Sequence, residues 1–268
     1  MINKTIPLTI YIRAKNEEKR IGPVVKRAVL TGAEVIIIDD YSNDKTAEIV
    51  ENNGGKIIKQ KWLGRGRQKR VAEDAASNKW LLDIDSDELL SYELINEIKK
   101  IFEFGEPEPG IYSLKYIVIP PCPKGSIWNN ANVDRRNKLY HKDIIRVPDH
   151  EAWDQFKVPN LIKIKKLKNP VYHYSFINLD QEVSKMNRAS SDRANSSKIK
   201  SKPILIMRIL FAFPFYFFKK YFKQKMFTGG FYGYICAIII ASNRWLKDVK
   251  MYEIHLMKKG INNINDEE

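Results

Sequence analysis

Short, nearly continuous apolar runs alternate with amphipathic stretches along the first part of the chain. The runs predict four strands, at residues 8–12, 34–39, 56–62 and 80–85. Between and after them, apolar side chains recur at helical spacing, as in Val71, Ala72, Ala75 and Ala76 and in Leu94, Ile95, Ile98, Ile101 and Phe102. Asn16 is the predicted cap of the first helix. Apolar strands that alternate with helices are typical of an α/β fold, with a mostly parallel sheet flanked by helices.

The pattern changes near Gly110, and we therefore divide the chain into three parts. Residues 1–110 form the strand–helix repeat described above. Residues 111–178 contain shorter strand signals around a proline-rich loop. Residues 179–268 begin with a polar helical stretch and continue with two strongly apolar ones, which predicts a helical end to the chain.

The basic charge of the chain, +14 overall, is concentrated in its second part. Residues 1–110 hold 18 Lys and Arg and 19 Asp and Glu, whereas residues 111–268 hold 28 and 13. Such an asymmetry indicates an anionic partner, either nucleic acid or a membrane surface.

The stretch from Ser196 to Lys225 contains eight Lys and Arg, six Phe, two Tyr and no acid. Its apolar core at 203–218 has 16 residues and is interrupted by Arg208 and Pro214, so it is shorter than the roughly 20 residues that span a bilayer. A basic, aromatic and apolar helix of this kind is typical of a membrane interface. The alternative is a core helix with solvated lysines at its ends.

The cellular compartment is indicated only indirectly. Cys122 and Cys236 lie far apart, which suggests neither a disulfide framework nor a zinc site. The first residues meet charge early, unlike a secretory signal. We therefore expect a cytoplasmic protein, attached peripherally to the inner face of the cytoplasmic membrane.

The segment LLDIDSDE, residues 81–88, brings carboxylates together at the end of a predicted buried strand. Ligands of open α/β sheets bind at such carboxyl ends. Asp85 and Asp87 are the expected ligands of Mg²⁺ or Mn²⁺, because both metals prefer hard oxygen donors. Asp83 lies one alternation earlier in the strand, on the same face as Asp85, and we expect it to support the pair, either hydrogen-bonded to a basic group or partly protonated.

Two further segments suggest nucleotide binding. Asp39 and Asp40 end the second predicted strand, where a base or a ribose could be hydrogen-bonded. The segment WLGRGRQKR, residues 62–70, places Gly64, Gly66 and Lys69 around a helix start that could approach a diphosphate. An ordinary basic turn explains this segment equally well.

The segments YIRAKNEEKRIG, IIIDDYSNDKTAEI, WLGRGRQKRVAEDAA and LLDIDSDELLS resemble, in order and spacing, family 2 glycosyltransferases with the GT-A (Rossmann-like) fold. The resemblance covers roughly residues 6–255. It is greatest to the branch of lipopolysaccharide-core β-1,4-glucosyltransferase-like proteins, whose motifs match Lys15–Glu18, Gly64–Lys69, Asp85–Glu88, His150–Glu151 and His173–Ser175.

The resemblance implies roles for individual residues. Asp39, with Asp40, would bind the uridine of a nucleotide sugar, and Asp85 and Asp87 would bind the metal. Glu151 would be the catalytic base, with His150 beside it in the substrate site, and Asp149 and Asp154 are its rivals. His173 would approach the metal or the diphosphate. Arg13 stands where the family commonly has Thr, which implies an altered donor pocket, and Lys138 replaces a common arginine.

The resemblance therefore implies an inverting, metal-dependent transfer of a hexose from a nucleotide sugar, most simply a UDP-sugar. The acceptor would be a lipopolysaccharide-core or other lipid-linked glycan. In this interpretation 1–110 binds the nucleotide sugar, 111–178 forms the acceptor side, and 179–268 contacts the membrane or the acceptor. A nucleotidyltransferase acting on a sugar phosphate and a nucleic-acid-binding module are the alternatives; we expect no nucleic-acid partner.

Overall fold

The computed structural model describes residues 5–119, 133–257 and 260. Its chain forms two compact units. The first, here called the sheet unit, comprises residues 1–117 and 134–174, and the second, the helical unit, comprises residues 118–133 and 175–268. The three sequence-based ranges 1–110, 111–178 and 179–268 stay predictions. Cys122 lies outside the described residues.

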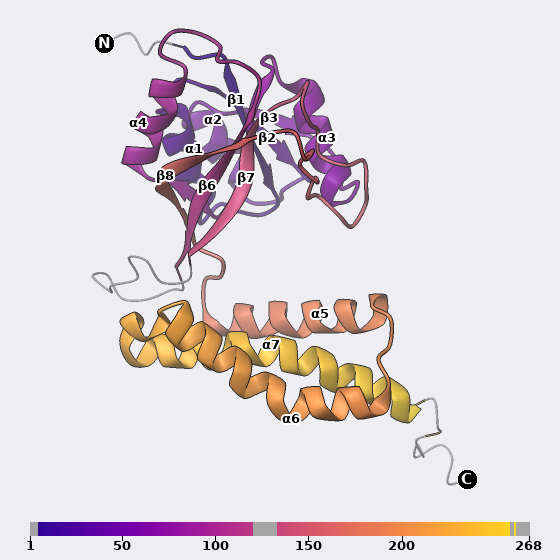
Figure 1. The fold of residues 1–268 in the computed structure, drawn as a ribbon. Coiled ribbons are helices and arrows are strands. Elements are labelled where there is room, and N and C mark those ends of the chain that lie inside the picture. Colours follow the sequence, from indigo (N-terminus) through magenta and orange to yellow (C-terminus); the bar gives the residue numbers. More distant parts are fainter. Residues whose placement is uncertain (1–4, 120–132, 258–259, 261–268) are drawn as a thin grey trace. The chain divides into compact units, whose positions relative to one another are not determined.

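The sheet unit is built on one eight-stranded sheet in the order β3-β2-β1-β4-β7-β6-β8-β5 (Figure 1). Its strands are β1 (Leu8–Ala14), β2 (Glu34–Asp39), β3 (Lys56–Lys59), β4 (Trp80–Asp85), β5 (Glu88–Leu90), β6 (Ile111–Val118), β7 (Val133–His141) and β8 (Ile164–His173). β1, β2, β3 and β4 run parallel, as the apolar runs predict. β7 joins β4 antiparallel and β5 joins β8 antiparallel, so the complete sheet is mixed.

Helices cover both faces of the parallel strands (Figure 1). They are α1 (Ile21–Val29), α2 (Thr46–Asn52), α3 (Arg65–Ala75) and α4 (Tyr92–Ile101). α1 and α4 bury their apolar sides in one core cluster together with alternate residues of β1 and β4. α3 packs on the opposite face through Ala72, together with Ala76 just after its end, against Tyr11, Leu81 and Tyr140 of the sheet. The fold is therefore α/β with helices on both faces, as expected.

The predicted cap of the first helix is wrong. α1 begins at Ile21 with Arg20 as its N-cap, and Asn16 lies four residues before that position. Asn16 instead adopts a left-handed backbone (φ 54°), and its side-chain oxygen accepts a hydrogen bond from the Asn43 amide at 2.9 Å. Asn tolerates this conformation better than most residues, so it joins two loops rather than starting a helix.

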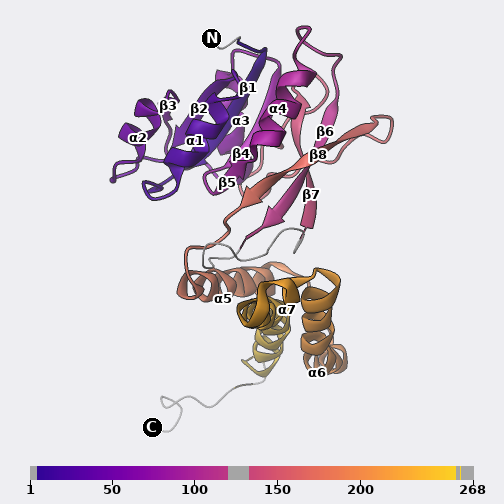
Figure 2. The same ribbon diagram turned by 90° about the vertical axis from the view of Figure 1, so that its left-hand side faces the viewer.

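The helical unit contains α5 (Leu179–Ser196), α6 (Lys202–Phe218) and α7 (Gly230–Met257) (Figure 2). A single π-helical turn at Lys219–Lys223 and a 3₁₀ turn at Met226–Gly229 join α6 to α7. α7 packs against both α5 and α6. Among the described residues of α6 only Leu205 is buried, so α6 is not the core helix that was the alternative prediction.

Within the described residues, one helical stretch, Met226–Met257, is long and apolar enough to cross a membrane. Of its most apolar 18 residues, 28% are buried within the protein.

Candidate active site

The carboxyl ends of β1, β2 and β4 meet at one edge of the sheet. Parallel pairing places Arg13 of β1 beside Asp85 of β4, and Ala14 beside Asp39 of β2. The candidate residues at the strand ends therefore come from separate segments, and the register of the parallel strands brings them together. This is the edge at which open α/β sheets bind ligands.

Three cations surround the carboxylates at the end of β4. Lys69 of α3 bonds Asp83 at 2.6 Å (Nζ to Oδ2), and Lys138 of β7 bonds the same oxygen at 2.9 Å. Arg13 donates from Nη2 to Asp85 Oδ1 at 2.9 Å, and Lys138 lies 3.8 Å from Asp85 Oδ2. The positive partners of this acidic segment in the structure are therefore side chains from β1, α3 and β7.

These contacts favour the charged forms of both Asp85 and Lys138. Burial raises the pKa of Asp85, but Lys138, Lys69 and Arg13 outweigh it and hold the pKa well below its ordinary value. Burial lowers the pKa of Lys138, but Asp83, Asp85 and Glu88 raise it well above its ordinary value. Asp85 and Lys138 are therefore both ionised at neutral pH, and they present fixed charges to any ligand at this edge.

Buried polar atoms without partners also gather here. Among the described residues, Arg13 Nε, Asp83 Oδ1 and His173 Nδ1 are buried and make no hydrogen bond within the protein. Buried polar groups are nearly always paired, so three orphaned atoms in one site indicate contacts that a ligand or water supplies.

Asp87 and Glu88 lie just beyond the β4 strand end and have different surroundings. Asp87 lies 3.5 Å from His173 Nε2 and 3.7 Å from Arg20 Nη1. Glu88 is fully buried and accepts from Tyr116 Oη at 3.1 Å, Arg136 Nη1 at 3.0 Å and the Asp85 amide at 3.0 Å. Glu88 thus holds the turn that presents Asp85 and Asp87.

The same turn can be tested as a metal site. No three Asp, Glu, His or Cys side chains converge on one point within residues 5–119 and 133–257. Mg²⁺ in nucleotide sites is commonly held by one or two carboxylates, with phosphate oxygens and water as the other ligands. The side chain of Asp85 is 32% exposed, and the partnerless Nδ1 of His173 belongs to a ring beside Asp87. Asp85 and Asp87 therefore fit that mode.

At the end of β2, Asp39 and Asp40 are engaged in the turn that follows. Asp39 accepts hydrogen bonds from the amide (3.0 Å) and the hydroxyl of Ser42. Asp40 is bonded to Lys15 Nζ at 2.6 Å and to the Trp62 amide at 2.9 Å. Both carboxylates thus stabilise the loops beside the strand end.

The two glycines at the start of α3, Gly64 and Gly66, allow close contact with a loop rather than with a phosphate. The Arg65 amide donates to the Glu151 carbonyl at 2.5 Å, and the Gly66 amide donates to the His150 carbonyl at 3.0 Å. A Cβ at Gly66 would come within 2.8 Å of the backbone carbonyl oxygens of Pro148, His150 and Trp153. The first two amides of the helix are therefore already used by this loop, and the approach of a diphosphate to this helix start stays a prediction.

The loop of residues 148–154 holds three candidate bases, Asp149, Glu151 and Asp154, and their surroundings differ. Asp154 is bonded to Lys69 at 2.9 Å and lies 3.6 Å from Arg13, and these cations lower its pKa against the effect of burial. Asp149 pairs with Arg67 at 3.1 Å. Glu151 is exposed, and its carboxylate forms no ion pair with the described residues. His150 organises the loop, since its Nδ1 accepts from the amides of residues 152 and 153.

Sequence reasoning missed the central positions of Lys138 and Asp154. The family motifs indicate Lys138 only as a replacement for arginine, although the Lys138 side chain contacts both Asp83 and Asp85. The same comparison marks Asp154 only as a rival base, although it joins the loop to Lys69 and Arg13. The strand that holds Lys138, VDRRNKLYH, is mostly polar, so its local pattern gave no signal of these contacts.

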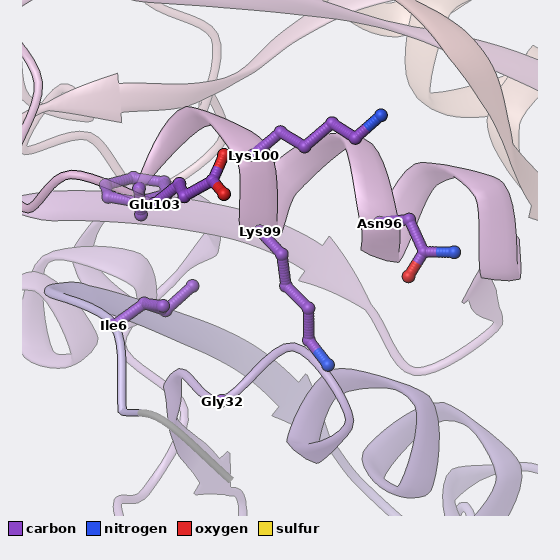
Figure 3. Close-up of a pocket in the computed structure, with 7 residues that line it drawn as sticks. Ile6, Gly32, Asn96, Lys99, Lys100 and Glu103 are labelled. Atoms are coloured by element: carbon purple, nitrogen blue, oxygen red, sulfur yellow. The ribbon is translucent and has the colours of Figure 1, made fainter.

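A separate cavity of about 440 Å³ lies at the opposite edge of the sheet (Figure 3). Ile6 and Gly32, which line it, precede β1 and β2, and Lys99 and Glu103 come from the end of α4 and the turn after it. This edge holds the amino ends of the parallel strands, so the cavity is not part of the candidate site.

Comparison with known proteins identifies the family. The model of glycosyl transferase family 2 matches residues 9–169. The chain belongs to glycosyl transferase family 2. An uncharacterized glycosyltransferase of Rickettsia typhi is 31% identical over 262 residues, which cover 95% of this chain and 89% of that protein. The resemblance inferred from the motifs is thus confirmed, and the chain is a glycosyltransferase.

Two other similarities are weaker. The lipopolysaccharide core biosynthesis glycosyltransferase LpsC of Rhizobium meliloti is 32% identical over 90 residues, which cover 32% of this chain and 33% of that protein. The crystal structure of S. aureus TarS 1–349 covers 96% of this chain and 93% of that chain, at 15% identity and a TM-score of 0.41. A similarity at that TM-score transfers no functional detail to this family 2 member.

Proposed function

We propose that this glycosyltransferase moves a hexose from a nucleotide sugar, most simply a UDP-sugar, to a lipopolysaccharide-core or other lipid-linked glycan. The observation that carries the proposal is the cluster of Asp83, Asp85, Arg13, Lys69 and Lys138 at the carboxyl edge of the parallel strands. It provides fixed charges of both signs where a sugar nucleotide would bind. The partial similarity to LpsC supports the acceptor class.

Glu151 is the proposed catalytic base. An acceptor hydroxyl is a weak nucleophile, so a carboxylate has to accept its proton as the hydroxyl attacks the anomeric carbon. Asp154 is a poorer candidate because Lys69 and Arg13 lower its pKa and both lie at its Oδ2. A single base without an enzyme nucleophile gives one displacement, and the configuration at the anomeric carbon is inverted.

Mg²⁺ or Mn²⁺ is the proposed cofactor, held by Asp85 and Asp87 with His173 nearby. Bound there, the metal would supply charge stabilisation for the departing nucleoside diphosphate. Positive charge at the same edge also comes from the protein itself, through Arg13, Lys69 and Lys138. Asp39 and Asp40 are proposed to bind the uridine from the adjacent strand end.

The helical unit is proposed to lie on the inner surface of the cytoplasmic membrane. Exposed apolar side chains recur at helical spacing along α6 and its π-helical turn, namely Met207, Leu210, Phe211, Phe215, Phe218 and Phe222. Residues 175–257 carry 14 Lys and Arg against five Asp and Glu. An apolar stripe in such a basic unit matches an anionic lipid surface.

A donor panel tests the proposed transfer directly. UDP-, GDP- and dTDP-sugars are incubated with the full chain and a lipid-linked glycan acceptor, with Mg²⁺, Mn²⁺ or EDTA, and nucleotide release is measured. We expect release from one nucleotide class, its loss with EDTA, and loss in Asp85→Asn and Glu151→Gln. Asp143→Asn is the matched control, because Asp143 pairs with Lys79 on the protein surface.

Two outcomes would contradict parts of the proposal. Full activity of Asp85→Asn in EDTA would remove the metal assignment, and full activity of Glu151→Gln would remove the base. Consumption of a nucleoside triphosphate and a sugar phosphate instead would identify the nucleotidyltransferase alternative, which family membership does not favour.

A further inference from the structure

A basic cavity within the helical unit has no role in the proposed transfer. It encloses about 190 Å³ and is lined by Arg193 of α5, Lys219 and Lys220 of the π-helical turn, and Arg244 of α7. No acidic side chain among the described residues lines it. Since a water molecule occupies about 30 Å³ in the liquid, the space accommodates a small anionic group together with water.

The convergence of these cations is not explained by helix ends alone. Lys219 and Lys220 follow the C-terminus of α6, where the helix dipole favours positive charge. Arg193 lies in the last turn of α5 and benefits from the dipole of its own helix, whereas Arg244 lies in the middle of α7 and does not. Arg244 also lies over the Tyr216 ring, with its Cζ 5.5 Å from the ring centroid, which directs it toward this cavity.

The positive field extends to a neighbouring lysine. Burial lowers the pKa of Lys247, and Lys200, Arg244 and Arg193 lower it further, against the opposing effect of Asp248. Asp248 itself is fully buried and is paired with Arg208 at 2.8 Å. The nearby acid therefore already has a partner, and it does not neutralise the two arginines of the cavity.

Two side-chain amides in the cavity are incompletely hydrogen-bonded. Gln224 Oε1 and Asn243 Oδ1 are buried and make no hydrogen bond within the described part of the protein. Either amide can turn by 180° so that its NH₂ group faces the cavity. Water could satisfy the amides and hydrate Arg193 and Arg244, which are both exposed at the rim of the cavity. An oxyanion would bond the same groups and would also compensate the positive charge that gathers there.

We propose that this cavity binds a phosphate group, supplied by the headgroup of an anionic lipid or by a free phosphate compound. Arg193 and Arg244 would donate charge-assisted hydrogen bonds to its oxygens, and Lys219 and Lys220 would add charge. The site is assembled entirely from the helical unit. Phosphate binding at this site does not depend on whether the chain transfers sugar. An experiment that finds no phosphate binding would therefore leave the proposed function untouched, and the reverse is also true.

Binding is measured on the full chain by calorimetry and by co-sedimentation with vesicles. The soluble probes are inorganic phosphate and dihexanoyl phosphatidic acid. The vesicles contain phosphatidylcholine alone or phosphatidylcholine mixed with phosphatidic acid. Arg193→Gln combined with Arg244→Gln tests the cavity. Arg188→Gln combined with Lys223→Gln is the matched control, since it removes two exposed charges of the same unit that do not line the cavity.

We expect the cavity variant to bind dihexanoyl phosphatidic acid about 10- to 100-fold more weakly, from the loss of one or two charge-assisted hydrogen bonds. The control should change less than about threefold. Preference for the lipid headgroup and for anionic vesicles identifies a lipid as the source, whereas equal binding of inorganic phosphate identifies a free phosphate compound.

Gln224→Glu provides a second variant that keeps the shape of the cavity. Its carboxylate would neutralise the cations, so we expect the protein to remain folded while phosphate binding is lost. Equal weakening in the cavity and control variants would overturn the proposal, because it indicates diffuse surface charge. Failure of both soluble probes to bind the unmodified chain would overturn it as well.

Discussion

Gly66→Ala tests how the loop of residues 148–154 is held against α3. The added Cβ would lie within 2.8 Å of the carbonyl oxygens of Pro148, His150 and Trp153, closer than side-chain carbons approach such atoms. Backbone atoms cannot rotate away as a side chain does. The loop therefore has to retreat, and the hydrogen bonds from the amides of residues 65 and 66 are lost with it.

The magnitude follows from these contacts. Overpacking costs about 1–3 kcal/mol, and each lost hydrogen bond about 0.5–1.5 kcal/mol. Because detachment of the loop relieves the clash, these costs are not fully additive, and we expect a loss of about 2–4 kcal/mol in the free energy of unfolding. Displacement of a catalytic group by about 1 Å can reduce the rate about 100-fold, so transfer should fall further than stability alone explains.

Urea denaturation followed by circular dichroism measures the stability, and a faster tryptic cleavage after Lys157, three residues beyond the loop, reports that the loop has come away. Gly110→Ala is the matched control, since a Cβ there meets its nearest atoms at 3.7 and 3.8 Å, an ordinary contact. If Gly66→Ala keeps the stability and the protease resistance of the unmodified chain, the loop is not held as described.

Two further predictions concern charged groups in the two units. The cations that lower the pKa of Asp154 make its ionised form stabilising above its unfolded-state pKa of about 3.9, and that contribution is lost as pH falls through the lower folded-state value. The free energy of unfolding should therefore decline below about pH 4, and it should decline less steeply in Asp154→Asn than in the unmodified chain. Urea denaturation at several pH values measures this dependence, and the same decline in both proteins would contradict the assignment. In the helical unit, Arg208→Met leaves the buried Asp248 without its partner and should cost about 3–5 kcal/mol, whereas adding Asp248→Leu should restore most of the loss in the same assay. A double variant no more stable than the single one would show that the ion pair is not the cause.

Much of the parallel half of the sheet could be predicted because its signals are local. Each apolar run reports a buried strand, and each helical spacing reports a buried face. The alternation along β4 likewise predicts that Asp83 and Asp85 share one face, and Lys138 contacts both of them. The first cap was mistaken because Asn suits a left-handed turn as well as a helix start.

The partners of the acidic segment could not be predicted in the same way. Arg13, Lys69 and Lys138 are separated along the chain by 56 and 69 residues, and only the strand order and the packing of α3 bring them together. Likewise, the segment with Gly64 and Gly66 at the start of α3 has the composition of a phosphate turn, whereas the folded chain fills that space with residues 148–153.

The sequence by itself determined the class of fold, the strand end at which the carboxylates gather, and the motifs of the family. The tertiary structure alone decided which cations neutralise those carboxylates, which of three acids in the loop stays unpaired, and which basic residues of three helices line one cavity. The physical reason is that periodicity records how each element meets the core, whereas contacts between distant segments depend on the packing of the whole unit.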